Sequence, residues 1–143
     1  MNKHFGHPFL PGCLLMLCLG LVSCSDDPKY PEGPDASIYT ARQRVTNLWE
    51  WSLVLDDNTA LTGIYADSTI EFTNDDVVRI CDLEGNCREG EWSLVSKRTR
   101  LQMIFGRKTE VFDIRMLRKN EMWLRMGTDS STIDWELRSV ETE

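Results

Sequence analysis

The feature of this chain that most limits its fold is the alternation of apolar and polar side chains between residues 49 and 137. A period of two places the apolar side chains on one face of a β-strand. Glycines or polar clusters separate the alternating segments, as is typical of tight turns. Eight such segments occur, at residues 49–55, 70–73, 78–80, 91–94, 100–105, 112–116, 121–126 and 133–137.

The distribution of proline supports a sheet. All five prolines lie at or before Pro34, so more than a hundred residues follow without one. A proline-free chain suits a sheet in which nearly every N–H donates to a neighbouring strand. Because most connections are short, we expect an all-β domain over residues 38–143. In it, an antiparallel eight-stranded meander closes into a small barrel without open edges.

A short helix is possible before the first strand. Ile38, Ala41, Val45 and Leu48 recur at helical spacing, and Asp35 could cap the N-terminus. The alternative is that this piece continues the preceding segment, which is rich in proline. That segment, residues 24–37, is predicted to be a semi-extended tether.

Residues 1–23 have the pattern of an export signal. Lys3 supplies a positive start, and residues 9–22 are almost wholly apolar. This apolar run has 14 residues, whereas a helix that spans a bilayer needs about 20. We therefore expect a cleaved signal peptide and not a membrane span.

The end of this signal, "LVSC" at residues 21–24, resembles the lipobox of bacterial lipoproteins. The resemblance implies that Cys24 is acylated and becomes the first residue of the mature protein. Two or more acyl chains hold a protein firmly on a bilayer. The following "SDD", residues 25–27, resembles the acidic tag of surface lipoproteins in Bacteroidetes-type bacteria. The chain is thus expected on the outer membrane through its N-terminal lipid, and the periplasmic and cell-surface orientations both stay open.

The strand pattern also resembles the lipocalin-like domains of lipoproteins from Bacteroidetes-type bacteria. The stretches that carry the resemblance are "NLWEWSL", "STIEF", "REGEWSLVSKRTRLQM" and "IRMLRKNEMWLR". They cover roughly residues 45 to 140, and the long connection after the first strand fits as well. The resemblance implies a lipocalin-like barrel, but it carries over no ligand-binding residue.

Two cysteines, Cys81 and Cys87, remain in the domain once the signal and Cys24 are set aside. They flank "DLEGN", a turn-forming stretch between two strand segments. Opposed positions across a hairpin bring two sulfurs within bonding reach, and an exported protein meets an oxidising compartment. We expect a disulfide, with free thiols or a thiolate metal site as the alternatives.

Several classes of chemistry lack their usual residues. Both histidines, His4 and His7, lie in the predicted signal, which leaves no histidine for a Ser–His–Asp set, a Cys–His pair or a histidine metal site. The acidic pairs of the domain lie in predicted turns without the spacing of a calcium loop. The net charge of −7 and the lack of a basic stripe argue against nucleic-acid binding. We predict a protein that is not an enzyme and has no cofactor or metal.

The aromatic residues on the apolar face are candidates for a ligand site, although filling the core is their simpler role. An eight-stranded barrel can hold one small ligand or be filled by side chains. The candidate ligand-binding residues are Trp49, Trp51, Phe72, Trp92, Phe105 and Trp135. We predict a cell-envelope binding module for a small apolar ligand or an envelope partner. The alternative is an accessory lipoprotein or enzyme inhibitor that binds protein through an outer face at Trp123 and Arg125.

Overall fold

The computed structural model describes residues 28–34, 36–128 and 130–141. The predicted signal peptide and Cys24 lie outside the described residues. One short helix precedes nine strands, and a 3₁₀ turn, η1 (Thr62–Ile64), follows the second strand. The elements are α1 (Ala41–Val45), β1 (Asn47–Asp56), β2 (Thr59–Ala60), β3 (Thr69–Phe72), β4 (Val77–Cys81), β5 (Cys87–Val95), β6 (Arg100–Phe105), β7 (Lys108–Leu117), β8 (Glu121–Thr128) and β9 (Ser131–Ser139).

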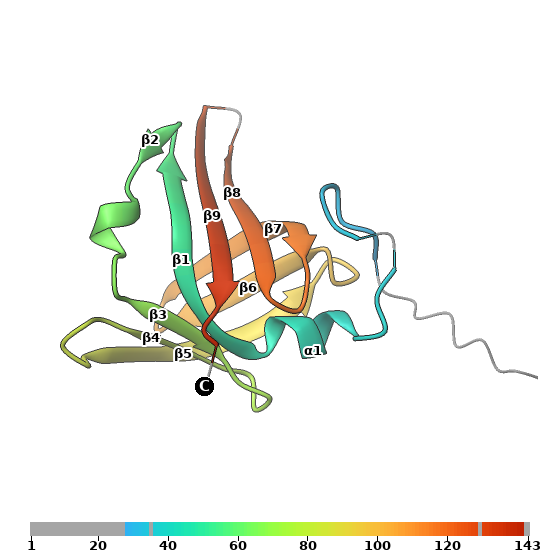
Figure 1. Ribbon diagram of the computed structural model, residues 1–143, viewed down its shortest axis with the longest axis horizontal. Coiled ribbons are helices and arrows are strands. Elements are labelled where there is room, and N and C mark those ends of the chain that lie inside the picture. The colour runs from blue at the N-terminus through green and yellow to red at the C-terminus, as the bar shows by residue number, and fades with distance from the viewer. Residues whose placement is uncertain (1–27, 35, 129, 142–143) are drawn as a thin grey trace, which may run out of the picture.

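The strands form a closed antiparallel barrel, which confirms the predicted all-β class and the eight-stranded meander. From β3 to β9 each strand pairs with the next one, and β1 pairs with both β3 and β9. The short β2 pairs only with the end of β1 and stands outside the eight strands of the barrel (Figure 1). Because β1 pairs with the last strand, the barrel has no open edge along its wall.

The barrel has two different ends. The closed end consists of α1 and the turns β3–β4, β5–β6 and β7–β8. The mouth consists of the connections β1–β2, β4–β5, β6–β7 and β8–β9, together with η1 (Figure 1). The core between them contains all four inward tryptophans, Trp49, Trp51, Trp92 and Trp135, packed among Phe, Ile, Leu and Met side chains.

Two bulges change which side chains face the core. The register of β1 against β9 shifts between Trp51 and Leu53, so Val54 is buried while Leu53 and Leu55 are only half-buried. Strict alternation over residues 49–55 predicts that Leu53 and Leu55 face the core with Trp49 and Trp51. This prediction is wrong because the bulge inserts one unpaired residue. A second shift in β7, between Ile114 and Met116, turns Leu117 toward the core.

Helix α1 closes one end of the barrel. Thr40 is its N-cap, and its hydroxyl and the Gln43 side chain form a reciprocal capping box. The predicted cap, Asp35, lies outside the described residues. Ile38 was expected on the buried face but is 91% exposed, because the helix begins only at Ala41.

Residues of the predicted tether pack against the same end. The Tyr30 ring is buried, and its hydroxyl donates to the carbonyl oxygen of Arg98 at 3.0 Å. The Glu32 N–H donates to the carbonyl of Arg115, and the two side chains form an ion pair at 2.7 Å. The chain therefore reaches the barrel at its closed end.

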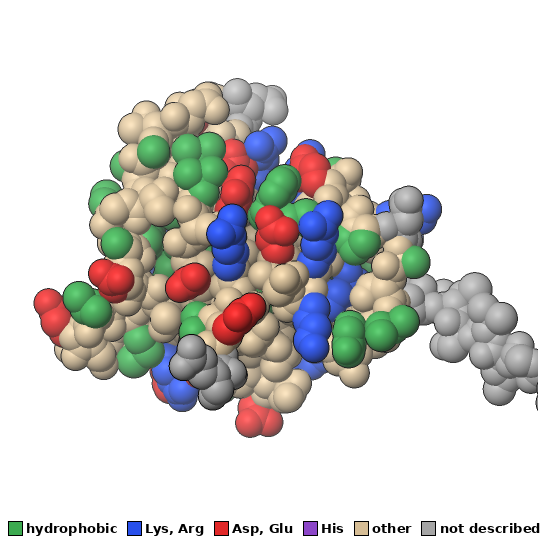
Figure 2. Space-filling view, viewed as in Figure 1, with side chains coloured by type: hydrophobic (Ala, Val, Ile, Leu, Met, Phe, Trp, Pro, Cys, Tyr) green, Lys and Arg blue, Asp and Glu red, His purple; other side chains and the backbone are tan. Residues whose placement is uncertain are grey.

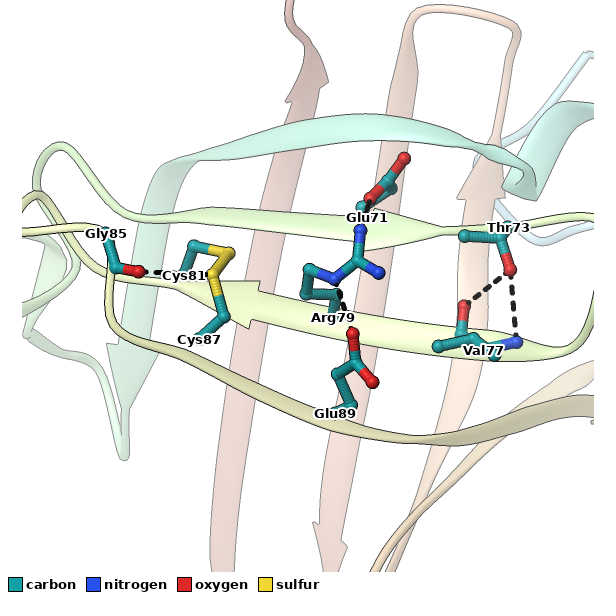
Figure 3. A network of polar contacts seen from close by, with 8 residues as sticks. All are labelled: Glu71, Thr73, Val77, Arg79, Cys81, Gly85, Cys87 and Glu89. Atoms are coloured by element: carbon teal, nitrogen blue, oxygen red, sulfur yellow. Dashed lines mark hydrogen bonds and ion pairs between the residues drawn. A yellow bond between two sulfur atoms is a disulfide. The ribbon is translucent and has the colours of Figure 1, made fainter.

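The outer face of β3, β4 and β5 carries a polar ladder and the disulfide (Figure 3). Arg79 lies between Glu71 and Glu89 and pairs with both carboxylates, at 2.9 and 2.8 Å. Cys81 and Cys87 are directly opposed across the β4–β5 hairpin and form a disulfide. The predicted disulfide is thus confirmed, and it staples a hairpin that forms part of the mouth.

Candidate ligand-binding site at the mouth

A cavity of about 200 Å³ lies inside the mouth of the barrel. We call it the mouth cavity. Its walls combine three aromatic rings, three aliphatic or thioether side chains and three charged groups. The lining residues are Trp51, Tyr65, Ile80, Arg88, Lys108, Glu110, Met126, Ile133 and Trp135. A concave, mostly apolar site with a few polar groups is the usual form of a small-molecule site.

Three aromatic rings form one wall of the mouth cavity. The ring centroids of Trp51 and Trp135 are 5.5 Å apart at 84°, an edge-to-face arrangement. Tyr65, from the loop after η1, lies 5.2 Å from Trp51 and 6.3 Å from Trp135. The loop thus adds an aromatic ring that belongs to no barrel strand.

Glu110 places a carboxylate among these rings. It pairs with Met103 across β6 and β7, on the side of the sheet that faces the core, and only 8% of the residue is exposed. Its Oε1 pairs with the Lys108 ammonium at 2.6 Å. Lys108 itself is largely exposed, so the pair connects the interior of the mouth with solvent. A carboxylate buried to this degree is rare unless it is paired.

Three buried polar atoms of the mouth cavity residues have no hydrogen-bond partner within the part of the chain that the structure describes. They are the indole nitrogens of Trp51 and Trp135 and Oε2 of Glu110. At the closed end, the Trp49 indole donates to the carbonyl of Val45 at 2.9 Å, and the Trp92 indole donates to that of Thr73 at 3.0 Å.

Each unpaired buried polar group costs about 1–3 kcal/mol. Native proteins contain few such groups, and each calls for an explanation. Two donors and one acceptor left unpaired around one cavity are therefore a polar signal of a binding site.

The mouth cavity continues outward into a groove between η1 and the disulfide hairpin. This groove has a volume of about 370 Å³ and shares Tyr65, Ile80 and Arg88 with the cavity. Ile64, which is 73% exposed, also lines it. The Arg88 guanidinium stacks on the Phe105 ring at 4.6 Å, which fixes the charge at the junction of cavity and groove.

The structure separates the predicted ligand residues into two groups. Trp51 and Trp135 line the mouth cavity. The second group, which is almost completely buried, consists of Trp49, Phe72 and Trp92. The two indoles of this group donate to backbone carbonyls at the closed end. The Phe72 ring packs on Trp92. Phe105 is half-buried beneath Arg88 and is not part of the cavity wall.

Sequence reasoning did not identify Glu110, Lys108, Tyr65 or Arg88 as site residues. For Glu110 a signal was present, since it has the same parity as the core residues Phe112 and Ile114. A carboxylate at an inward position of a strand is therefore a candidate site residue, as the inward tryptophans are. Tyr65 had no such signal, because it comes from a loop whose path the strand pattern does not determine.

The predicted partner-binding residues lie on the outer wall. Trp123 is half-buried, and its indole donates to the Glu121 carboxylate at 3.1 Å. Arg125 forms two hydrogen bonds with Asp134, at 2.6 and 3.0 Å. Burial, and next the negative charge of Glu121, raise the pKa of the nearby Glu136 carboxyl. Acidic and basic side chains alternate on this part of the surface (Figure 2), and the side chains of Trp123 and Arg125 already have partners.

Comparison of the sequence with models of known protein families and with curated proteins finds no match. Among residues 28–34, 36–128 and 130–141, no helix is long and apolar enough to cross a membrane. The same residues contain no group of three or more potential metal-binding side chains.

Proposed function

We propose that this protein is a non-enzymatic binding module of the cell envelope that takes a small ligand into the mouth cavity. The observation that supports this most is the set of three unpaired buried polar atoms on Trp51, Trp135 and Glu110. A ligand that bonded to these atoms would remove a cost that the free protein bears. The lipid anchor at Cys24 and the outer-membrane location are part of the same proposal.

The chemistry of the cavity favours a ligand with an apolar body and a hydroxyl group. A hydroxyl can accept from an indole N–H and donate to a carboxylate. The aromatic wall favours a flat or ring-shaped body. The volume of about 200 Å³ is below the range of about 300–1,000 Å³ typical of drug-sized ligands. The ligand is therefore small, or only one end of it enters the cavity while the rest lies in the groove.

The alternative, a protein partner on the outer wall, has weaker support. The Trp123 indole donates to Glu121, and Arg125 donates two hydrogen bonds to Asp134. A protein partner that bound here would have to break these hydrogen bonds or bind without using them. The mouth, by contrast, contains polar groups without partners.

Tryptophan fluorescence with probes that share one body tests the proposal. We expect benzyl alcohol to shift the emission of the full chain and to bind more tightly than toluene, which has the same ring without the hydroxyl. The affinity of the Glu110→Gln variant for benzyl alcohol should fall at least about tenfold, since a hydrogen bond to a charged group is worth about 1.5–3 kcal/mol. Its affinity for toluene should change little.

Glu91→Gln is the matched control, because Glu91 is exposed on the outside of β5. This variant should bind both probes as the wild type does. If neither probe altered the emission, or if both glutamine variants behaved alike, the mouth cavity would not be the binding site.

A further inference from the structure

Two exposed apolar side chains stand beside the closed end of the barrel. Ile38 is 91% exposed and Tyr39 is 38% exposed, just before the N-cap of α1. The Lys119 ammonium, from the β7–β8 turn, lies 5.3 Å from the centre of the Tyr39 ring. An exposed aliphatic residue next to an aromatic ring and a lysine is the composition of a membrane-interface contact.

Further cations lie at the same end of the molecule. Lys97 and Arg98 occupy the β5–β6 turn, and Arg118 precedes Lys119 in the β7–β8 turn. Lys97 is exposed and has no ion-pair partner among the described residues. In the closed-end turns, Asp76 pairs with Arg42 and Glu121 pairs with Arg118. Asp75 is exposed and has no ion-pair partner among the described residues. Figure 2 shows Lys and Arg side chains over the region of β7, β8 and α1.

The chain that leads to Cys24 ends at this side. Tyr30 is buried at the closed end, six residues after Cys24. Six residues reach at most about 20 Å even when fully extended. If Cys24 carries lipid, Tyr30 therefore stays within about 20 Å of the bilayer surface, which brings the closed end within reach of the headgroups.

We propose that the closed end is a second membrane contact, in which Ile38 and Tyr39 enter the headgroup region of an anionic bilayer while Lys97 and Lys119 face its phosphates. Basic residues near an anionic surface are attracted within a Debye length of it. The contact orients the barrel so that the mouth cavity receives its ligand from the aqueous side. The proposal rests on the acylation of Cys24 but not on ligand binding in the mouth.

The test uses the acylated full chain in vesicles of phosphatidylcholine with phosphatidylglycerol. A fluorophore is attached at Ile38→Cys or, as the matched control, at Ile64→Cys, which lies at the mouth and is 73% exposed. A lipid with a spin label in its headgroup should quench the label at position 38 at least several-fold more than the label at position 64. Equal quenching at both positions would overturn the proposal.

Charge-reversal variants measure how much the basic side chains of the closed end contribute to membrane binding. In the unacylated Cys24→Ser chain, Lys97→Glu together with Lys119→Glu should weaken flotation with anionic vesicles at least threefold. Arg107→Glu, at the exposed β6–β7 turn of the mouth, should leave flotation unchanged. The proposed contact would be contradicted if the reversal at the closed end and the reversal at the mouth weakened flotation equally. It would also be contradicted if the chain floated as well with pure phosphatidylcholine vesicles as with anionic vesicles. Mass spectrometry of the N-terminal peptide, and the benzyl alcohol titration above, report separately on acylation and on the mouth cavity.

Discussion

At the closed end of the barrel the indole N–H groups of Trp49 and Trp92 donate to backbone carbonyls, whereas those of Trp51 and Trp135 at the mouth have no partner among the described residues. All four rings are buried to a similar degree. The two mouth rings are only slightly more exposed, at 7% and 6%, than the two closed-end rings, at 0% and 2%. The difference lies in whether the polar atom of each ring is satisfied within the fold.

The same contrast applies to charge. At the closed end, the buried Arg44 donates to the carbonyl of Leu117 at 2.5 Å and thereby ties α1 to β7. At the mouth, the buried Glu110 pairs through one oxygen with an exposed lysine and leaves the other oxygen unpaired. The closed end also contains a buried polar atom without a hydrogen bond among the described residues, the Thr46 hydroxyl oxygen. At the mouth, however, three such atoms belong to residues that line one cavity, which is the arrangement expected of a binding site.

The largest expected effect comes from one substitution made at both ends. Trp49→Phe removes a buried indole that donates to Val45 and leaves both a cavity and an unpaired carbonyl. We expect the free energy of unfolding to fall by about 2–4 kcal/mol. Trp51→Phe removes a donor that has no partner, so it should cost about 1 kcal/mol. Urea unfolding with unchanged m-values measures both, and similar losses at the two positions would remove the distinction between the ends.

A smaller effect is expected from removal of the disulfide, which lies at the mouth. Replacing Cys81 and Cys87 together by serine should lower the free energy of unfolding by about 2 kcal/mol, since the bond closes only a short loop. Hydrogen exchange should show lost protection in the β4–β5 hairpin, while the amides of α1 keep theirs relative to global unfolding. Loss of protection spread evenly over both ends would show that they do not behave as separate units.

The smallest effect is expected at Glu136, on the outer wall between the two ends. Burial, and next the charge of Glu121, raise its pKa in the folded protein. The folded state therefore holds this proton more tightly than the unfolded state, and the contribution to stability is lost as the pH rises through the folded pKa.

Glu136→Gln should accordingly be slightly more stable than the wild type at pH 7. The gain should disappear as the pH falls below the ordinary glutamate pKa of about 4.3. Thermal unfolding across this pH range measures the difference. The affinity for benzyl alcohol should stay unchanged, and a change would mean that the outer wall is coupled to the mouth.

The local sequence pattern was sufficient to predict where the barrel strands lie and that Cys81 and Cys87 form a disulfide. Period-two alternation and turn residues act over a few positions, so segments such as residues 101–105 and 112–116 could be recognised without knowledge of the rest. Cys81 and Cys87 were predicted as a pair because a hairpin opposes positions at equal distances from its turn. A short helix was one of two possibilities that the sequence left open, and its N-cap is Thr40 and not the expected Asp35.

The bulge in β1, the closure of the barrel and the residues around the mouth cavity depend on the tertiary structure, because no local sequence pattern contains them. The bulge after Trp51 reverses the parity of Leu53 and Leu55, and a bulge depends on the partner strand. The pairing of β1 with β9 joins opposite ends of the domain and sets which tryptophans lie at the mouth. Only this closure brings Glu110, Trp51, Trp135 and the loop residue Tyr65 around one cavity, because contacts between distant segments form only once the whole barrel is assembled.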